Sequence, residues 1–309
     1  MTDERLSLLG QRASLLARMR NLAKEAPGSE PARRVQLTVA MDRFLARMLA
    51  TTAWGSWILK GGYANQLRAP SKARFTQDVD LRIDAPLDQA RAILAAAAST
   101  DLADLFSYQV GAPKPLVGPP GGGLRFPVLV NLAGSLFVSF GADLNSQDAI
   151  VGEIERHPSD PLVGALGFAI SEFPVYPIAQ QFAEKLHALT RPRDQQNTRV
   201  KDLADMVWFS ERYSFSSSAL IDAGLATFGR RGEHAWPPSI PDAPTSWSRA
   251  YAELRRELKI QPATAQEARD VLAAFLEPAL AGQRGRTSRV GNGWSQQHAA
   301  DDAAPTEGK

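Results

Sequence analysis

The segment RFTQDVDLRID, residues 74–84, constrains the fold most, because apolar and acidic residues alternate in it. In a β-strand alternate side chains share a face, so Asp78 and Asp80 are predicted to point to one side and Val79 and Leu81 to the other. The apolar side has to pack in a core, whereas the acidic side has to be compensated. We therefore predict a strand whose buried face fixes the position of two carboxylates.

Two interpretations of these acids are open. The strand could be an exposed edge strand with acids at its outward positions. Alternatively, two carboxylates roughly 7 Å apart hold a divalent cation, Mg²⁺ or Mn²⁺, together with a substrate phosphate. The segment LKGGYANQL, residues 59–67, favours the cation. Gly61 and Gly62 lie between a predicted strand and a predicted helix, where their backbone N–H groups could approach a phosphate closely.

A third acid lies in SLFVSFGADLNS, residues 135–146, near the end of a second strand-like run. Asp143 falls on the polar face of that strand by its parity. If this strand neighbours the first, Asp143 converges with Asp78 and Asp80. Three such carboxylates are the predicted metal site for phosphoryl or nucleotidyl transfer, in which one of them also positions or deprotonates the attacking hydroxyl.

The composition excludes several classes of protein. The 309 residues include no cysteine, so disulfide frameworks, thiolate zinc sites and cysteine nucleophiles are ruled out. No stretch approaches the ~18 consecutive apolar residues of a membrane span, and the first residues lack the apolar core of a secretory signal. We expect a cytoplasmic protein with no membrane association. A net charge of +2 is too small to indicate a polyanionic partner by itself.

The changing pattern along the chain predicts four parts. They are an N-terminal helical segment (1–34), a core of strands and helices (35–150), a helical C-terminal lobe (151–281) and a disordered tail (282–309). The fold class is therefore α+β, with a mixed sheet flanked by helices and followed by helices. Within the core, residues 35–52 and 86–105 are predicted helices. The tail is polar and glycine-rich and cannot bury enough surface to become ordered.

Several motifs in a fixed order resemble the AbiEii/AbiGii family of nucleotidyltransferase toxins, which includes the MenT toxins. The motifs are LKGG, RFTQDVDL, FGADL and VYPIAQQFAEKLHAL…RVKDLADMV, over about residues 55–210. The resemblance implies a DNA polymerase β-like nucleotidyltransferase core with a helical C-terminal lobe. It also implies a toxin that a separately encoded antitoxin protein holds in check.

The resemblance assigns roles position by position. The matching positions are Asp78 and Asp80 for the metal-binding pair, Gly61 and Gly62 for the phosphate turn, Lys185 for the nucleotide-contacting lysine, and Asp202 and Asp205 for the acids of the second helical motif. The choice between Asp202 and Asp205 as the functional acid stays open.

The residues of the helical motifs agree with these roles without requiring them. Lys185 lies at the margin of an apolar stripe, and a lysine ammonium is a compact point charge that suits a triphosphate. A solvated surface lysine is the alternative. Asp202 and Asp205 are three positions apart and share a helix face, which a salt-bridged helix explains as well. His187 is expected at the helix surface or against a partner.

Two residues ahead of the acidic strand are further candidates. Arg74 could clamp a phosphate or pair with Asp78, and we favour the phosphate. Thr76 shares the strand face of the acids and is expected at the mouth of the site, so a negatively charged modification there would repel a triphosphate. The other nearby acids, Asp84 and Asp148, are expected in solvent.

These observations together predict an enzyme that transfers a nucleotide from a nucleoside triphosphate (NTP) to an acceptor hydroxyl and releases pyrophosphate. The resemblance implies that the acceptor is the 3′ end of tRNA, whose blocking arrests translation. Basic residues near the helical motifs agree with a phosphate-tracking surface: Arg191, Arg193, Arg199 and Lys201. The alternatives are a protein or small-molecule acceptor, or a polymerase β-like binding module that no longer catalyses.

Overall fold

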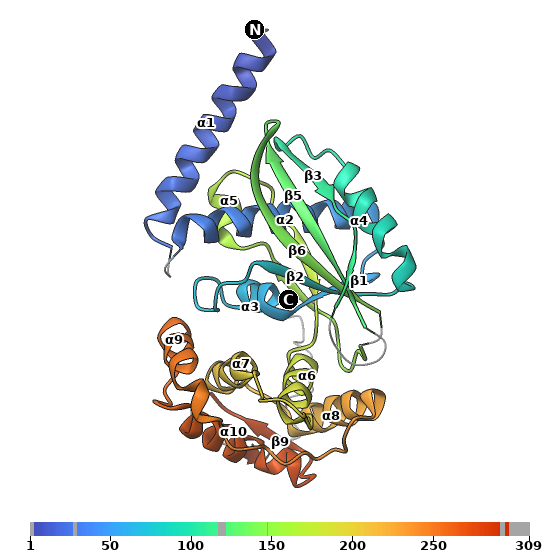
Figure 1. The fold of residues 1–309 in the computed structure, drawn as a ribbon, viewed down its shortest axis with the longest axis vertical. Helices are drawn as coiled ribbons and strands as arrows, with labels where there is room; N and C mark the ends of the chain where they lie inside the picture. Colours follow the sequence, from blue (N-terminus) through green and yellow to red (C-terminus); the bar gives the residue numbers. More distant parts are fainter. Residues whose placement is uncertain (1–2, 27–29, 117–121, 147, 291–293, 297–309) are drawn as a thin grey trace, which may run out of the picture. The chain divides into compact units, whose positions relative to one another are not determined.

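The computed structural model describes residues 3–26, 30–116, 122–146, 148–290 and 294–296 (Figure 1). The chain divides into two compact units. Unit 1 consists of Met1–Asp148 and Glu153–Tyr176, and unit 2 consists of Ala149–Gly152 and Pro177–Lys309. Each unit has its own architecture, and unit 1 carries the acidic strand.

Unit 1 is built on a mixed sheet with the strand order β3-β5-β6-β2-β1-β8-β7, and β4 pairs with β5 at one side. The strands are β1 Trp57–Lys60, β2 Asp78–Ile83, β3 Phe106–Val110, β4 Lys114–Pro115, β5 Leu124–Leu132, β6 Ser135–Asn145, β7 Glu155–Pro158 and β8 Glu172–Val175. The pairs β2–β6 and β1–β8 are parallel, and the other pairs in this sheet are antiparallel. Helices flank the sheet, which confirms the predicted α+β class.

The helices of unit 1 supply the apolar surface that one sheet face needs. They are α1 Asp3–Ala23, α2 Pro31–Thr51, α3 Gly61–Arg68, α4 Ala90–Ser99 and α5 Pro161–Ala165, with a short 3-10 turn at Leu87–Gln89. Helix α2 packs on the sheet and on α4, and its apolar residues Met41, Phe44 and Met48 are fully buried (Figure 1). It begins at Pro31, whose fixed φ suits the first helical turn, so the predicted helix over 35–52 starts one turn earlier.

Strand β2 has the predicted alternation. Val79, Leu81 and Ile83 are fully buried, whereas Asp78 and Asp80 on the opposite face are partly exposed. Its neighbour β6 alternates in the same way, with Ala142 and Leu144 in the core. Both strands therefore have one apolar face in the core and one polar face turned away from it.

Strands β5 and β6 form a long hairpin with a two-residue turn. Leu132 pairs with Ser135, and the turn residues Ala133 and Gly134 have φ angles of 48° and 76°. Positive φ at both central positions is the type I′ geometry, whose twist matches that of the flanking strands. The hairpin sets which residues of β5 face the acids of β6.

The boundary predicted at residue 150 is wrong for the segment 153–176. Its strands β7 and β8 complete the sheet of unit 1, where Leu59 of β1 pairs with Val175 of β8. Each strand has only four residues, too few for a clear alternating pattern. The predicted helix over 86–105 is also shorter in the structure, because α4 ends at Ser99 and β3 begins at Phe106.

Unit 2 is mainly helical around an aromatic core. Its elements are α6 Ile178–Thr190, α7 Val200–Arg212, α8 Ser217–Arg231, a 3-10 turn at Thr245–Trp247, α9 Ser248–Leu258, α10 Ala265–Leu280, β9 Arg286–Ser288 and β10 Trp294–Gln296. The Phe182 ring lies 5.4 Å from the ring of Phe215 and 5.8 Å from that of Phe275. Burial of these rings contributes the main stabilisation of a helical unit of this kind.

The tail from residue 282 is more ordered than its composition predicts, because β9 and β10 pair with each other. The Ser288 amide donates to the Phe215 carbonyl over 2.8 Å, and the Trp294 indole donates to the Phe275 carbonyl over 2.8 Å. One partly buried tryptophan thus supplies an anchor that the polar composition conceals. Residues 291–293 and 297–309 of the predicted disordered tail lie outside the described residues.

Among the helices that the structure describes, none combines the length and apolar character needed to cross a bilayer.

His187 is buried in unit 2, so the expectation of a surface histidine is wrong. Its ring lies 4.8 Å from the Phe228 ring and 4.6 Å from the His234 ring, and no part of the residue is exposed. Burial lowers the pKa of His187 to about 3, and the nearby positive charge of Arg231 acts in the same direction. The folded protein therefore holds this imidazole neutral.

We predict that acid destabilises unit 2 through His187. The unfolded chain binds a proton on this residue below pH 6.5, whereas the folded chain does so only near pH 3. The unfolded state therefore binds more protons between these values, and the free energy of unfolding falls as the pH is lowered through this window. Urea titrations at pH 7 and pH 5 should show a smaller loss for His187→Leu than for the wild type. Equal losses would contradict the assignment.

Candidate active site

Four charged residues form one row across the sheet of unit 1. Lys60 of β1 pairs with Asp80 of β2, Asp80 pairs with Asp143 of β6, and Asp143 pairs with Arg125 of β5. Directly paired residues of neighbouring strands place their side chains on the same face. The structure thus brings Asp80 and Asp143 together, with a cation on either side of the two acids. We call these four residues the charged row.

Asp78 lies beside the charged row and shares Arg125 with it. The Arg125 guanidinium donates to both carboxylate oxygens of Asp143, from Nε and from Nη2, each over 2.6 Å. Its Nη2 also lies 3.3 Å from Oδ2 of Asp78. The hydrogen bond to Asp143 raises the pKa of Arg125 above its ordinary value, and the charges of Asp143, Asp78 and Asp80 add to the effect. All three predicted carboxylates therefore act on one guanidinium.

The side chains of Asp80 and Asp78 occupy space that is open because Gly61 and Gly141 have no side chain. A Cβ at Gly61 would lie 2.0 Å from Oδ2 of Asp80, and Gly61 has a φ of +68° that also favours glycine. A Cβ at Gly141 would lie 2.5 Å from Oδ1 of Asp78. Each acid thus sits directly over a glycine. For Gly61 this closeness places the predicted phosphate turn against Asp80.

Thr76 and Arg74 lie in the irregular segment that precedes β2. Thr76 is only 8% exposed, and its hydroxyl donates to the Asp78 carbonyl over 3.2 Å. A Cβ at Gly62 would lie 2.8 Å from the Cβ of Thr76, so the threonine packs on the second glycine of the turn. Arg74 is partly exposed. Thr76 therefore joins the glycine turn to the acidic strand, and its regulatory role stays a prediction.

Asp148, expected in solvent, is instead bound to Lys60. Their side chains form a salt bridge and are 12% and 13% exposed, and Asn145 donates to the same carboxylate over 2.6 Å. The Lys60 ammonium also lies 5.9 Å from the centre of the Tyr176 ring. Asp84 is 70% exposed, as expected. Lys60 and Arg125 are the residues of the charged row that the sequence analysis missed.

The chemistry of these side chains fits a hard divalent cation, because carboxylate oxygens are the ligands that Mg²⁺ and Mn²⁺ prefer. Their arrangement is not that of a finished metal site. In the described part of the chain, no three acidic or histidine side chains are placed to hold a metal ion. Asp143 instead accepts both of its strong hydrogen bonds from Arg125. The donor types are present, and a guanidinium lies against two of the carboxylates.

The predicted residues of the helical motifs come together in unit 2. Lys185 of α6 places Nζ 3.1 Å from Oδ1 of Asp202 and 2.8 Å from Oδ2 of Asp205, both on α7. Arg199 lies 3.7 Å from the other oxygen of Asp202. Asp205 is buried, whereas Asp202 keeps some exposure. The two carboxylates thus fix the ammonium of Lys185 between two helices.

A family model described as "Nucleotidyl transferase AbiEii toxin, Type IV TA system" matches residues 43–295. The chain belongs to this family. It is thus a nucleotidyltransferase toxin of a toxin–antitoxin system, with an NTP as substrate and an antitoxin as partner. The match includes the charged row and the Lys185 contacts. No curated protein matches the chain.

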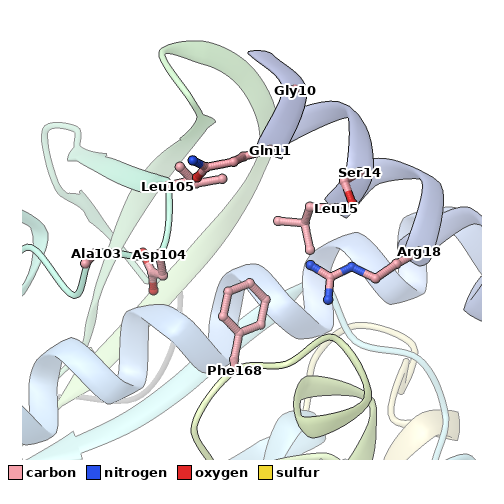
Figure 2. Close-up of a pocket in the computed structure, with 9 residues that line it drawn as sticks. All are labelled: Gly10, Gln11, Ser14, Leu15, Arg18, Ala103, Asp104, Leu105 and Phe168. Atoms are coloured by element: carbon pink, nitrogen blue, oxygen red, sulfur yellow. The ribbon is translucent and has the colours of Figure 1, made fainter. Parts of the chain in front are cut away.

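The AbiEii-family chain also has a cavity of about 420 Å³ in unit 1 (Figure 2). Gln11, Leu15 and Arg18 of α1 line one side of it, and Asp104 and Phe168 line the other. Asp104 is held by Arg43 and Arg47, and Arg18 donates to the Leu166 carbonyl over 2.8 Å. Since its charged groups already have partners within the chain and it includes no residue of the charged row, we assign it no role in nucleotide transfer.

We predict that Asp205 and Asp202 differ in their effect on the stability of this AbiEii-family toxin. Asp205→Asn removes the buried partner of Lys185 and should lower the free energy of unfolding by about 3 kcal/mol, since it leaves a buried charge poorly compensated. Asp202→Asn should cost less than about 1 kcal/mol, because that carboxylate is nearer to solvent. Urea unfolding of both variants measures the difference. Equal losses would show that Lys185 does not depend on the buried acid.

We predict that Gly61→Ala abolishes the placement of Asp80. The matched control is Gly134→Ala, since Gly134 has a similar φ of +76° but nothing within 4 Å of an added Cβ. Both variants should lose about 1 kcal/mol of stability from backbone strain. Only Gly61→Ala should reduce nucleotide transfer, by roughly two orders of magnitude, because the carboxylate is displaced. Similar activities in a transfer assay would refute the steric argument.

Proposed function

We propose that this AbiEii-family toxin attaches a nucleotide from an NTP to an acceptor hydroxyl at the 3′ end of tRNA, with Mg²⁺ or Mn²⁺ as cofactor. The observation that carries the proposal is the convergence of Asp78, Asp80 and Asp143, from two strands, beside Gly61. Carboxylates at the end of a glycine turn are what a metal-bound triphosphate requires.

Each candidate site residue of unit 1 has a part in the proposed reaction. Asp78 and Asp80 hold the cation, which would neutralise charge that develops on the phosphates. The backbone of Gly61 and Gly62 lies beside the phosphates, and Arg74 pairs with one of them. Asp143 completes the carboxylate set and orients the acceptor hydroxyl.

The proposed transfer forms one bond and breaks one bond. The acceptor oxygen forms a bond to the α-phosphorus of the NTP, and the bond from that phosphorus to the oxygen bridging to the β-phosphorus breaks. Pyrophosphate leaves with the bridging oxygen, and the hydroxyl proton passes to a carboxylate or to water. Positioning and charge compensation supply most of the acceleration in reactions of this class.

Lys185 is the proposed nucleotide contact of unit 2. Its ammonium is held by Asp202 and Asp205, so it is preorganised rather than free to rotate in solvent. An ammonium held in this way can donate a hydrogen bond to a phosphate oxygen with little loss of side-chain entropy. Since Asp205 is the more buried acid, we assign it the structural part and Asp202 the part nearer to the substrate.

The connection between α6 and α7 supports a nucleic-acid acceptor. Burial lowers the pKa of Arg193, and the nearby charges of Arg199 and Arg191 act in the same direction. Acids of the chain offset part of this positive charge, since Glu233 pairs with Arg191 and Asp202 pairs with Arg199. The remaining positive charge would suit an anionic partner such as the tRNA backbone. A protein or small-molecule acceptor is the alternative. A binding module without catalysis is a second one, and the close placement of the carboxylates favours the enzyme over it.

Regulation at Thr76 belongs to the same proposal. The hydroxyl is buried between Gly62 and the backbone of Asp78, so a phosphate on it would push the glycine turn from the acids. Such a modification would switch the enzyme off through geometry as well as through charge.

We predict that purified protein, incubated with Mg²⁺ and each α-labelled NTP in turn, labels bulk tRNA. Asp78→Asn should lower the rate by about two orders of magnitude, because a proposed ligand of the cation is lost. The matched control is Asp84→Asn on the same sequence segment, which should act as the wild type because Asp84 is exposed.

Two outcomes would favour one of the alternatives. Label in total protein instead of RNA would identify a protein acceptor. Absence of any transfer, with toxicity that survives Asp78→Asn, would identify the binding module.

A further inference from the structure

Asp143 cannot ligate a metal ion while it keeps its present contact with Arg125. Arg125 takes both oxygens of Asp143 in a parallel two-bond arrangement, and its Nη2 reaches towards Asp78. The planar fork of a guanidinium matches a carboxylate closely. An oxygen that accepts such a short charged hydrogen bond has little capacity left for a cation in the same direction.

The same contact is nevertheless one that an ion can displace. The Arg125 side chain is 45% exposed and that of Asp78 is 38% exposed, whereas Asp143 is 12% exposed. Water therefore reaches the guanidinium directly, and it screens the contact with Asp78 more than the contact with Asp143. A divalent cation also carries more charge than a guanidinium, in a smaller volume.

The hairpin fixes where Arg125 is found. Its register partner in β6 is Asp143 itself, and Gly141 next along that face leaves the guanidinium room, with 3.5 Å from an added Cβ to Nε of Arg125. Strand pairing therefore fixes the position of Arg125 in the charged row, which a residue on a loop would not have.

We propose that Arg125 is a built-in competitor for the divalent cation: its guanidinium holds Asp143 and Asp78 in the metal-free protein and has to leave them before Asp143 can ligate a metal. This inference rests on the metal site of the proposed function. Arg125 is thus a positioning residue that sets the affinity for the cation. After the guanidinium has left the carboxylates, the Arg125 side chain still lies on the same face of the sheet. A positive charge there suits the phosphates of an incoming NTP.

The test is a titration of the full-length protein with Mn²⁺ alone, followed by electron paramagnetic resonance of the free ion. Arg125→Gln should bind Mn²⁺ about fivefold to tenfold more tightly than the wild type, because a competing charge is gone. Arg125→Lys should lie between the two, since it keeps the charge without the two-bond fork. Arg249→Gln, at a side chain that is 94% exposed in unit 2, is the control and should bind as the wild type.

A second measurement covers the chance that Arg125→Gln folds poorly. Without metal, both Arg125 variants should melt at a lower temperature than the wild type, and Mn²⁺ should raise their melting temperatures by more. Weaker or unchanged Mn²⁺ binding in Arg125→Gln and Arg125→Lys would overturn the inference and leave the proposed function standing.

If the proposed metal site itself is wrong, the Mn²⁺ titrations will give a different result. Asp80→Asn should abolish binding in the wild-type background and in Arg125→Gln. Binding that does not depend on Asp80 in either background would overturn the metal site itself, and with it the role of Arg125.

Discussion

The parallel pairing of β2 with β6 is the constraint on which the candidate site depends. Side chains alternate along each strand, so a slip of one residue would turn Asp143 away from Asp80 and towards the core. Packing prevents the slip, because Val79 and Leu81 of β2 and Leu144 of β6 are fully buried on the opposite face. The carboxylates are thus held together by the burial of their apolar neighbours, against their own repulsion.

Cations that the sheet itself supplies relieve this repulsion. Lys60 and Arg125 stand at the two ends of the charged row, and each is tied to an acid, Asp148 for the lysine and Asp143 for the arginine. The charges of the row are thus partly balanced within the sheet, and the proposed role of Arg125 is to give up its share of this balance to a cation. The same logic recurs in unit 2, where two carboxylates hold the ammonium of Lys185.

The strands, the glycine turn and the paired acids could be predicted because their signals are local. Alternation in β2 and β6 and the order of the motifs were enough to expect Asp78, Asp80 and Asp143 on one face. Arg125 and Lys60 could not be found in this way, since register across three strand pairs brings them to the acids. Four-residue strands such as β7 and β8 have too short a pattern to be recognised, and a single tryptophan outweighed the polar composition of the tail.

The place of β8 in the sheet has a consequence for how the chain reaches its fold. The first strand to be synthesised, β1, ends at the glycine turn and gains its second neighbour only from β8, the last strand of this sheet along the chain. Until the ribosome has made Val175, one flank of β1 presents unpaired backbone groups, which invite association with other chains. A nascent toxin that already contains every acid of the charged row would therefore still lack β8, one of the strands of the sheet that supports them.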